Sequence, residues 1–373
     1  MIYLDNAATS FPKAPGVVDA VRRWYEKTGV SPSRGQSQLS EAVAAEVLET
    51  RRRVGRLCGH PAGEVAFTSG ATESLNLFLH GFLGPGDKVL TTALEHSSVV
   101  RPLTWLAEHA PIQLTVLAPD AEGYVHQGQV TDALEQGGHR LLVFTHASNV
   151  VGSVLDAAAF CRVAREHGCV TLLDASQTAG LLPLAVGADA VVASAHKSLL
   201  APPGLGFLCV EAELCNTIQP VKQGGTGSST ALAQHPREWP AAMEAGTPNT
   251  PAILGLLAAL RWHDKQDPAA SWRHGLACVD QLRQALGDHA RCFGPGTDKD
   301  MRIGVLSLVL SGLDPAEAGL LLSEAGIHVR TGYHCGPWIH EHLGTAAGGT
   351  VRVSPGPFTT TDDILAVPRA LGW

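Results

Sequence analysis

One of the eight cysteines in this sequence lies where a thiol can react rather than pack. Cys335 is part of the run RTGYHCGPW (residues 330–338), which has too few apolar residues for a core segment. A packing cysteine normally lies among aliphatic side chains, whereas a thiol on a glycine- and proline-containing loop beside a possible cation is better placed to react. The run therefore predicts a reactive Cys335, with Arg330 and His334 as neighbours.

Two apolar runs each lead to a side chain that could hold a cofactor. Asp174 closes the run VTLLD, and Lys197 follows the run AVVAS. An aspartate at a strand end often only caps the next turn, and a lone lysine is usually solvated. As a pair, however, they match the needs of pyridoxal phosphate, because a buried, neutral lysine amine can bond to the cofactor aldehyde. The carboxylate would keep the pyridine nitrogen protonated, so that the ring can accept an electron pair from the substrate.

The phosphate of such a cofactor needs hydroxyl and backbone N–H groups at the start of a helix. The run TSGATESLNLFL supplies them, because a predicted strand at 65–68 is followed by a glycine turn and then by a predicted helix. Ala71 and Thr72 begin this helix. We therefore expect both residues to line a cofactor site.

The composition is typical of a globular enzyme with two domains. The chain has 373 residues, of which 45% are hydrophobic and 17% are charged, so it can bury a large core. A net charge of −8 disfavours a broad nucleic-acid surface, which would need clustered lysine and arginine. The start MIYLDNAATS has no basic region followed by an apolar stretch, and no run approaches about 18 apolar residues. We therefore expect neither a signal peptide nor a membrane partner.

The remaining cysteines are expected to be structural. No pair has the C-x-x-C spacing of a zinc or redox site, so we predict no metal. Most lie in periodic apolar segments, where packing is the ordinary role of a free thiol. Scattered thiols without a disulfide framework indicate a reducing cytoplasm.

The elements that must position these residues alternate along the first two thirds of the chain. Short β-type runs alternate with helical stretches, and several of the runs are apolar almost throughout, as in strands covered on both faces. This alternation predicts a largely parallel sheet between helices, with ligands beyond the carboxyl ends of the strands. The predicted strands are Val65–Thr68, Lys88–Thr92, Gln113–Leu117, Leu141–Thr145, Val170–Asp174, Ala190–Ser194 and Gly206–Val210.

The pattern changes after a loop region, rich in glycine, proline and small polar residues, within 223–251. Helices are predicted near 251–265, 272–287 and 315–326, strands at 303–310 and 349–354, and a final helix capped by Thr361. We predict a large cofactor-binding domain over 15–248. A smaller α+β domain over 249–373, joined by residues 1–14, would carry the cysteine loop.

Motifs along nearly the whole chain resemble one known family. YLDNAATS, TSGATESLN, LEHSS, SNVVG, LLDASQTAG, SAHKSL, EAGTPNT and RTGYHCGPW…GTVRVSPG resemble the cysteine desulfurases and selenocysteine lyases of the class V aminotransferase superfamily. The short loop around Cys335 is similar to that of the second group of desulfurases. The resemblance implies an α/β protein of the pyridoxal-phosphate-dependent transferase fold type I. In that fold a large domain has a mainly parallel seven-stranded sheet, and a smaller α+β domain follows it.

The resemblance also implies roles around the cofactor ring. Lys197 would carry the cofactor as a Schiff base and move protons, and Asp174 would pair with the pyridine nitrogen. Gln177 would bond the phenolic oxygen, and His96 would stack on the ring and take part in proton transfer. Asn149 would lie near the substrate carboxylate and the phenolic oxygen. A structural histidine is the alternative for His96.

Further roles concern the phosphate and the substrate. Thr72, Ser194 and His196 would hold the phosphate, and Thr247 would reach the phosphate of a neighbouring subunit, which implies a homodimer. Arg352 would bind the substrate carboxylate through two hydrogen bonds. A solvated strand cation is the alternative for Arg352.

Three features depart from the family pattern. Gly336 replaces the usual alanine after the cysteine, and Trp338 stands where a smaller aliphatic residue is common. The segment SPSRGQSQLS (residues 31–40) lacks the usual histidine. These changes concern the substrate and the sulfur acceptor more than the cofactor.

The favoured interpretation is a pyridoxal-phosphate-dependent cysteine desulfurase, a transferase that converts L-cysteine to L-alanine. Cys335 would hold the sulfur as a persulfide, on a loop whose Gly332, Gly336 and Pro337 suit movement inward and then outward, for transfer to an acceptor protein. The alternatives are a selenocysteine lyase, a C–S lyase of a biosynthetic pathway, and a non-catalytic sulfur carrier or scaffold. Products from L-cysteine would separate them.

Overall fold

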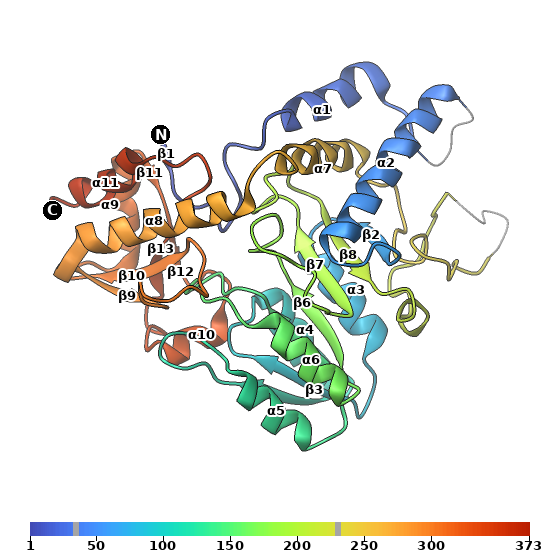
Figure 1. Ribbon diagram of the computed structural model, residues 1–373, viewed down its shortest axis with the longest axis horizontal. Coiled ribbons are helices and arrows are strands. Elements are labelled where there is room, and N and C mark those ends of the chain that lie inside the picture. The colour runs from blue at the N-terminus through green and yellow to red at the C-terminus, as the bar shows by residue number, and fades with distance from the viewer. Residues whose placement is uncertain (33–36, 228–232) are drawn as a thin grey trace.

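A seven-stranded sheet forms the centre of the computed structural model, which describes residues 1–32, 37–227 and 233–373 (Figure 1). Each predicted strand in this part of the chain is confirmed to within two residues at either end. In sheet order the strands are β2 (Glu64–Thr68), β8 (Gly206–Val210), β7 (Ala190–Ser194), β6 (Val170–Asp174), β5 (His139–Thr145), β3 (Lys88–Thr92) and β4 (Gln113–Leu117).

Strand β8 is the exception to the parallel arrangement. It pairs antiparallel with both β2 and β7, whereas β7, β6, β5, β3 and β4 pair in parallel. An antiparallel neighbour needs no helical crossover, so residues 195–205 turn directly from β7 into β8. This turn contains Lys197 and therefore holds it at the carboxyl end of β7.

Helices cover both faces of the large sheet, so its strands are apolar on both sides. Within β5, Leu142 and Phe144 belong to one core while Leu141 and Val143 belong to the other, as the two-residue period of a strand requires. One core includes α2 (Gln38–Leu57), α5 (Gln127–Glu135), α6 (Ala157–Glu166) and α7 (Thr250–His263). The other includes α3 (Ala71–Phe82) and α4 (Ser97–His109).

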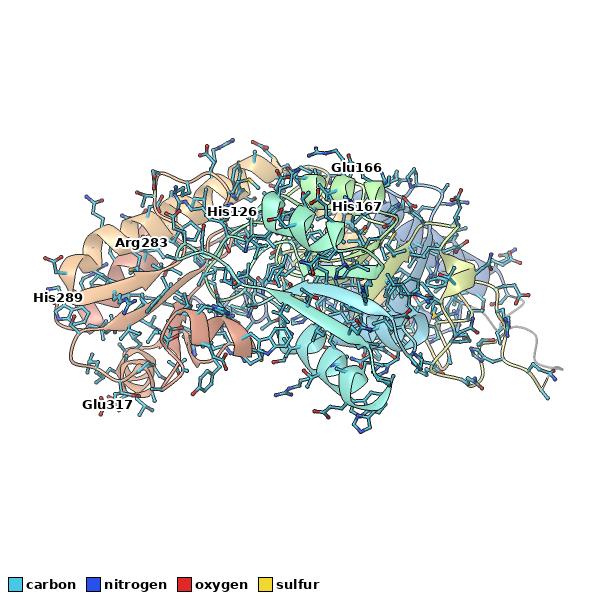
Figure 2. All side chains as sticks on the ribbon, turned by 90° about the horizontal axis from the view of Figure 1, so that it is seen from below. His126, Glu166, His167, Arg283, His289 and Glu317 are labelled. Atoms are coloured by element: carbon cyan, nitrogen blue, oxygen red, sulfur yellow. The ribbon has the colours of Figure 1, made fainter. Side chains whose placement is uncertain are left out.

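A smaller antiparallel sheet follows in the C-terminal part, at the left of Figure 1. Its order is β12 (Arg330–Gly332), β13 (Thr350–Val353), β10 (Leu306–Leu310) and β9 (Ala290–Phe293). It shares a core with α8 (Pro268–Leu286), α9 (Pro315–Glu324) and α11 (Thr361–Ala370). Figure 2 shows the two parts side by side, with Arg283, His289 and Glu317 on the smaller one and Glu166 and His167 on the larger.

The N-terminus joins this smaller part. Strand β1 (Ile2–Tyr3) pairs in parallel with β11 (Ile327–His328), so both chain ends lie there (Figure 1). Helix α9 begins at the predicted Asp314-Pro315 cap. The predicted cap of the final helix is wrong by one residue, because Thr360 rather than Thr361 accepts the N–H of Asp363.

The domain boundaries at 14/15 and 248/249 stay a prediction. Helix α1 (Val17–Arg23), followed by a single π-helical turn at Trp24–Thr28, packs against α7. Ile253, Leu256 and Leu260 of α7 lie in the core of the large sheet, which favours a second boundary after this helix.

Two sequence features reach beyond the described residues. Part of the SPSRGQSQLS segment (33–36) and part of the long loop (228–232) lie outside them. In the rest of the loop, no helix or strand occurs between 218 and 249 among the described residues. None of the helices in the described ranges has the length and apolar character needed to cross a membrane.

Candidate active site

A polar cavity of about 190 Å³ lies at the carboxyl edge of the large sheet, where the parallel strands β6 and β7 end. It contains residues from both parts of the molecule. From the large part come Ala71, Thr72, His96, Ser98, Asn149, Asp174, Ser176, Ser194, His196 and Lys197. From the N-terminal segment and the smaller part come Ala7, Ala8, Arg330, His334 and Arg352.

Lys197 and Asp174 face this cavity together. Burial lowers the pKa of the Lys197 amine below its usual value, and the charge of Asp174 opposes that shift. Asp174 is 5% exposed, and its Oδ1 accepts the N–H of Ser176 at 2.9 Å. One oxygen of Asp174 therefore caps the turn, as one interpretation predicted, while the side chain also lines the cavity. That Asp174 holds a ligand stays a prediction.

The first turn of α3 forms one end of the cavity. Ala71 donates its backbone N–H to Ser194 Oγ at 3.0 Å, and the Thr72 and Ser98 hydroxyls are 2.7 Å apart. Gly206 on β8 permits this approach, because a Cβ there would lie 2.5 Å from Gly70 Cα. A helix N-terminus with hydroxyls beside it is a favourable place for a phosphate.

Four polar atoms buried around this cavity have no hydrogen-bond partner among the described residues. They are Ser176 Oγ, His196 Nδ1, His334 Nδ1 and Arg352 Nε. Buried polar groups are nearly always paired, so four orphans around one cavity indicate a polar ligand. The hydroxyl and the guanidinium are donors suited to an anionic group.

His96 is held as a neutral ring. Its Nδ1 accepts the backbone N–H of Ser98 at 3.1 Å and so caps α4, and it lies 2.9 Å from the Ser98 hydroxyl. Burial lowers the pKa of His96 to about 4, and the charge of Lys197 adds to this. Because Nδ1 is an acceptor, the single ring proton is on Nε2.

Arg352 is almost completely buried, which excludes the interpretation as a solvated strand cation. It is 1% exposed, and its Nη2 donates to Asp5 Oδ1 at 2.7 Å. Its Nη1 donates to the carbonyl of Asn149 at 3.0 Å. Asn149 in turn donates its side-chain N–H to the carbonyl of His334 at 2.6 Å, which joins the guanidinium to the cysteine loop.

The thiol loop, residues 333–336 between β12 and α10 (Pro337–His342), is short and tightly bonded. His334 and Cys335 have φ angles of 49° and 59°, a left-handed conformation that is uncommon for residues other than glycine. The carbonyl of Cys335 accepts the N–H of Ser97 at 2.7 Å and its hydroxyl at 3.1 Å. These bonds hold the loop in this conformation.

The Cys335 thiol lies next to the cavity, and its cationic neighbour is Arg330. Arg330 lines the cavity and donates from Nη2 to Cys335 Sγ at 3.4 Å. His334 is different, because burial lowers its pKa to about 2 and keeps the ring neutral. Its Nε2 lies 2.8 Å from the Thr350 hydroxyl.

Comparisons with known proteins agree with this geometry. The model of the aminotransferase class-V family matches residues 2–367. The chain belongs to the class-V aminotransferase family. A probable cysteine desulfurase of Methanothermobacter thermautotrophicus is 30% identical, and the match covers 99% of this chain and 94% of the relative.

Two solved structures have the same fold. The apo structure of the cysteine desulfurase from Thermococcus onnurineus NA1 has a TM-score of 0.91 at 29% identity, covering 99% of this chain and 94% of that one. The S-sulfonic acid form of the cysteine desulfurase CsdA from Escherichia coli has a TM-score of 0.84 at 26% identity, covering 100% and 94%. The fold is that of the type I pyridoxal-phosphate enzymes, and the family depends on this cofactor.

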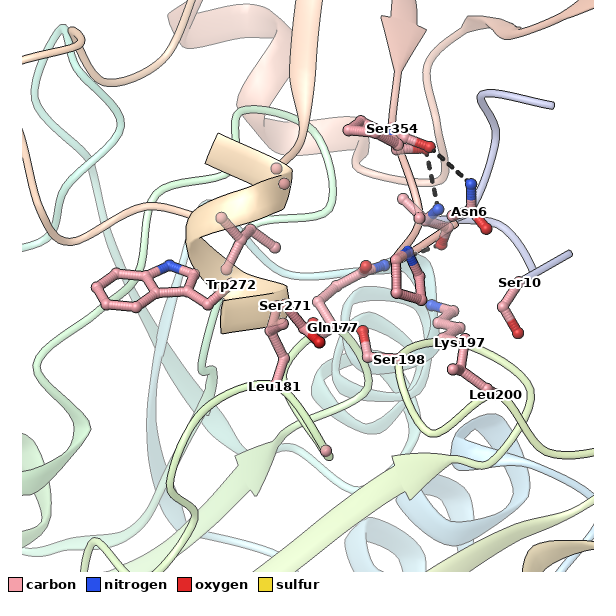
Figure 3. Close-up of a pocket in the computed structure, with 18 of the residues that line it drawn as sticks. Asn6, Ser10, Gln177, Leu181, Lys197, Ser198, Leu200, Ser271, Trp272 and Ser354 are labelled. Carbon is pink, nitrogen blue, oxygen red and sulfur yellow. Dashed lines mark hydrogen bonds between the residues drawn. The ribbon is translucent and has the colours of Figure 1, made fainter. Parts of the chain in front are cut away.

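Besides Cys335, which lies next to the cavity, two residues expected at the site lie outside its lining. Gln177 lines a neighbouring cavity that shares Ala7 and Lys197 with the first, as Figure 3 shows for Gln177 and Lys197. Its amide donates to the carbonyl of Ala7 at 3.0 Å. Thr247 is exposed on the loop before α7.

Several residues that contact the site had no role assigned from the sequence. Asp5 bonds the Arg352 guanidinium, Arg330 bonds the Cys335 sulfur, and Ser98 and Ser176 line the cavity. The signal for Asp5 was its place in YLDNAATS, and the signal for Ser176 was its nearness to Asp174. The bonds that these side chains make depend on the tertiary structure.

Glu95, next to His96, is also buried without an assigned role. Its Oε1 accepts the Thr92 hydroxyl at 2.6 Å and the N–H of Thr145 at 3.0 Å, while Oε2 has no partner among the described residues. Burial raises the pKa of Glu95 to about 8. The side chain is therefore mostly protonated at neutral pH and links the ends of β3 and β5.

Proposed function

We propose that this protein is a pyridoxal-phosphate-dependent cysteine desulfurase that converts L-cysteine to L-alanine and holds the sulfur on Cys335. The observation that carries the proposal is the position of Arg330. It lines the cavity together with Lys197 and Asp174, and it donates to the Cys335 sulfur at 3.4 Å. A thiol beside a guanidinium and next to a cavity with a poised lysine is an arrangement suited to sulfur transfer.

The cofactor would be held by residues that already face the cavity. Lys197 would bond to its aldehyde and Asp174 would pair with its ring nitrogen, while Thr72, Ser194 and His196, with Ser176, would bind its phosphate. When bound, pyridoxal phosphate supplies an electron sink for the pair released at the substrate α-carbon. The unpaired polar atoms of Ser176, His196 and Arg352 support this assignment, because a phosphate and a carboxylate would pair them.

Arg352 would bind the substrate carboxylate. Its Nε is buried and unpaired, while Asp5 and the Asn149 carbonyl fix the plane of the guanidinium. A guanidinium held in this way can offer two parallel N–H groups to a carboxylate. Asn149 would orient the same end of the substrate.

Protons would be moved by Lys197 and His96. Burial lowers the pKa of the lysine amine, so that more of it is in the neutral form that takes the α-proton at Nζ. His96 has its proton on Nε2 and its Nδ1 bonded to Ser98, so it would donate or accept at Nε2 only.

Cys335 would take the sulfur as a thiolate. Its Sγ forms a bond to the substrate sulfur, the carbon–sulfur bond breaks, and the electron pair of that bond stays with the carbon skeleton. Protonation of the skeleton completes L-alanine, so that L-cysteine and the thiol give L-alanine and a Cys335 persulfide. Arg330 would hold the Cys335 sulfur beside the cavity, because its Nη2 donates to Sγ.

The proposal extends to assembly, acceptor and compartment. Thr247 is exposed and away from its own cavity, which supports a homodimer in which Thr247 of one copy reaches the phosphate site of the other. A thiol of a second protein would accept the sulfur. All eight cysteines lie in the described ranges and are free, which supports a reducing cytoplasm.

Replacing the thiol tests this function. Cys335→Ser should abolish both alanine and persulfide formation from L-cysteine while the purified protein keeps the yellow colour of the cofactor. Cys292→Ser is the matched control, because Cys292 is a partly exposed cysteine of β9 and should leave both products unchanged. Alanine at the unmutated rate from Cys335→Ser would refute the proposal, and pyruvate in place of alanine would indicate a C–S lyase.

A further inference from the structure

A groove on the protein surface includes Cys335 among its lining residues. It runs between α3 and α4 and is open to solvent along its length. Thr72, His96 and Ser98 line both the groove and the cavity, so these residues separate the two spaces. Cys335 belongs to the groove and contacts the cavity through Arg330.

The length of the groove follows from helix geometry. Ser97, Arg101 and Trp105 lie four residues apart on α4 and therefore on one face, and Ser97 bonds the carbonyl of Cys335. At 1.5 Å per residue, Arg101 is about 6 Å and Trp105 about 12 Å along the helix from Ser97. An extended peptide covers these distances with about two and about four residues. The groove is thus long enough for a segment of protein.

The charge of the groove comes from one side chain. Arg101 is exposed, and among the described residues that line the groove none is a carboxylate. His80 also lines it, but burial lowers the pKa of His80, so its ring is mostly neutral at pH 7. An anionic group would therefore be attracted at the level of Arg101.

The outer end of the groove is aromatic. The Trp105 side chain is 48% exposed, and its ring stacks on His109 with the centroids 4.4 Å apart. His80 meets the other side of the indole edge-on at 5.3 Å. Tryptophan and arginine are the residue types that most often dominate protein interfaces, and here they lie one helical turn apart.

We propose that the groove between α3 and α4 docks the cysteine-bearing segment of a sulfur-acceptor protein, and that Arg101 selects segments with a carboxylate about two residues from that cysteine. This inference rests on the proposed function, because it requires a persulfide on Cys335. The acceptor thiolate attacks the outer sulfur, a new sulfur–sulfur bond forms, and the bond to Cys335 Sγ breaks. Cys335 leaves as a thiolate, so the persulfide group moves without net oxidation or reduction.

Two synthetic peptides test the selection. Each has nine residues with a central cysteine, leucine at both ends, glycine between, and either glutamate or lysine two residues to each side of the cysteine. The holoenzyme is loaded with one equivalent of sulfur-labelled L-cysteine, and the rate of label transfer to each peptide is measured. The glutamate peptide should react about three-fold faster, the size expected of an exposed charge pair, and added salt should reduce the difference.

Variants of α4 locate the effect. Arg101→Glu should reverse the order of the two peptides, and Trp105→Ala should slow both. Arg162→Glu is the matched control, because Arg162 is an exposed arginine of α6 on the opposite face of the sheet and should leave the order unchanged. Equal rates for the two peptides, or an unchanged order in Arg101→Glu, would overturn the proposal.

Two further readouts keep the outcomes distinct. The burst of alanine formed before any acceptor is added should be the same in the Arg101 variant and in the unmutated protein. A missing burst in the unmutated protein would refute the desulfurase function itself, whereas a normal burst with equal peptide rates would refute only the groove. Mercaptoacetate, a small anionic thiol, is a last comparison. Docking of a protein segment would also be overturned if mercaptoacetate removed the labelled sulfur from Cys335 as fast as the glutamate peptide does, and if Trp105→Ala did not change that rate.

Discussion

The sheet edge and the thiol loop form opposite sides of the same site, and they are held in different ways. Asp174 and Ser194 end two strands of one sheet and Lys197 follows the second, so the hydrogen-bond ladder of the core fixes their positions. The thiol loop has four residues, two of them with left-handed φ angles, and depends on bonds from Asn149 and Ser97. A rigid sheet edge suits a cofactor, whereas a loop held by a few polar bonds suits the proposed movement of the thiol between a substrate and an acceptor.

The largest effect is expected at the sheet edge, where Lys197 lies. Lys197→Ala removes the group proposed to move the substrate proton, so the rate of alanine formation should fall by about 10²–10⁴-fold. Circular dichroism and thermal unfolding should change little, since the side chain ends in a cavity. Lys265→Ala, at an exposed lysine after α7, should keep full activity. An active Lys197→Ala protein would contradict the role proposed for Lys197.

A second effect at the sheet edge is a pH dependence of the free energy of unfolding, which comes from Glu95. Burial raises the pKa of Glu95 to about 8, above the value of about 4.5 expected when unfolded, so the folded state binds the extra proton between these values. Glu95 therefore makes the free energy of unfolding fall as pH rises from about 5 to about 8, by at most about 1.4 kcal/mol per pH unit.

Glu95→Gln tests this dependence, because glutamine keeps the shape of the protonated acid and does not titrate. Denaturant unfolding at several pH values should show that the free energy of unfolding of the variant increases relative to that of the unmutated protein as pH rises towards 8. The control is Glu108→Gln on the exposed side of α4, where the two curves should stay parallel. Parallel curves for Glu95→Gln would mean that this carboxyl does not carry the proton.

The contrast also explains what the sequence could predict. The strands were predicted closely because a strand covered on both faces is a continuous apolar run, and the residues after such runs collect at one edge. The shared run RTGYHCGPW placed Arg330 near Cys335, and the structure adds the bond from Nη2 to Sγ. The bond from Arg352 to Asp5 was not predictable, since it joins residues 347 positions apart. Gln177 follows Asp174 closely, yet its amide turns to Ala7 because that carbonyl needs a donor.

Asp5 bonds Arg352, which is joined through Asn149 to the thiol loop. Replacing Asp5 should have an effect of intermediate size. Asp5→Asn keeps the shape but removes the charge that orients Arg352, so the affinity for L-alanine should fall about ten-fold. Ethylamine has no carboxylate and should bind as before, with both ligands followed by the absorbance of the bound cofactor. In Asp5→Glu, which keeps the charge, part of the affinity for L-alanine should be retained. An equal loss for both ligands would show general damage rather than a role in positioning the guanidinium.

The smallest effect concerns the thiol loop itself. A Cβ added at Gly336 would lie 2.7 Å from Val150 Cγ2. Gly336→Ala should therefore push the loop outward at a cost of about 1 kcal/mol and slow the first transfer of sulfur to Cys335 about five-fold. The cofactor spectrum should be unchanged, because the substitution does not alter the sheet edge that would hold the cofactor.

Val150→Ala removes the clashing methyl group, so the double variant should recover most of the lost rate even though each single change is unfavourable. Gly128→Ala is the control, because Gly128 lies on α5 with nothing within 4 Å of the added methyl group. Independent effects of the two changes would mean that the loop does not rest on Val150. In that case the bonds to Ser97 and Asn149 alone would set the position of the thiol.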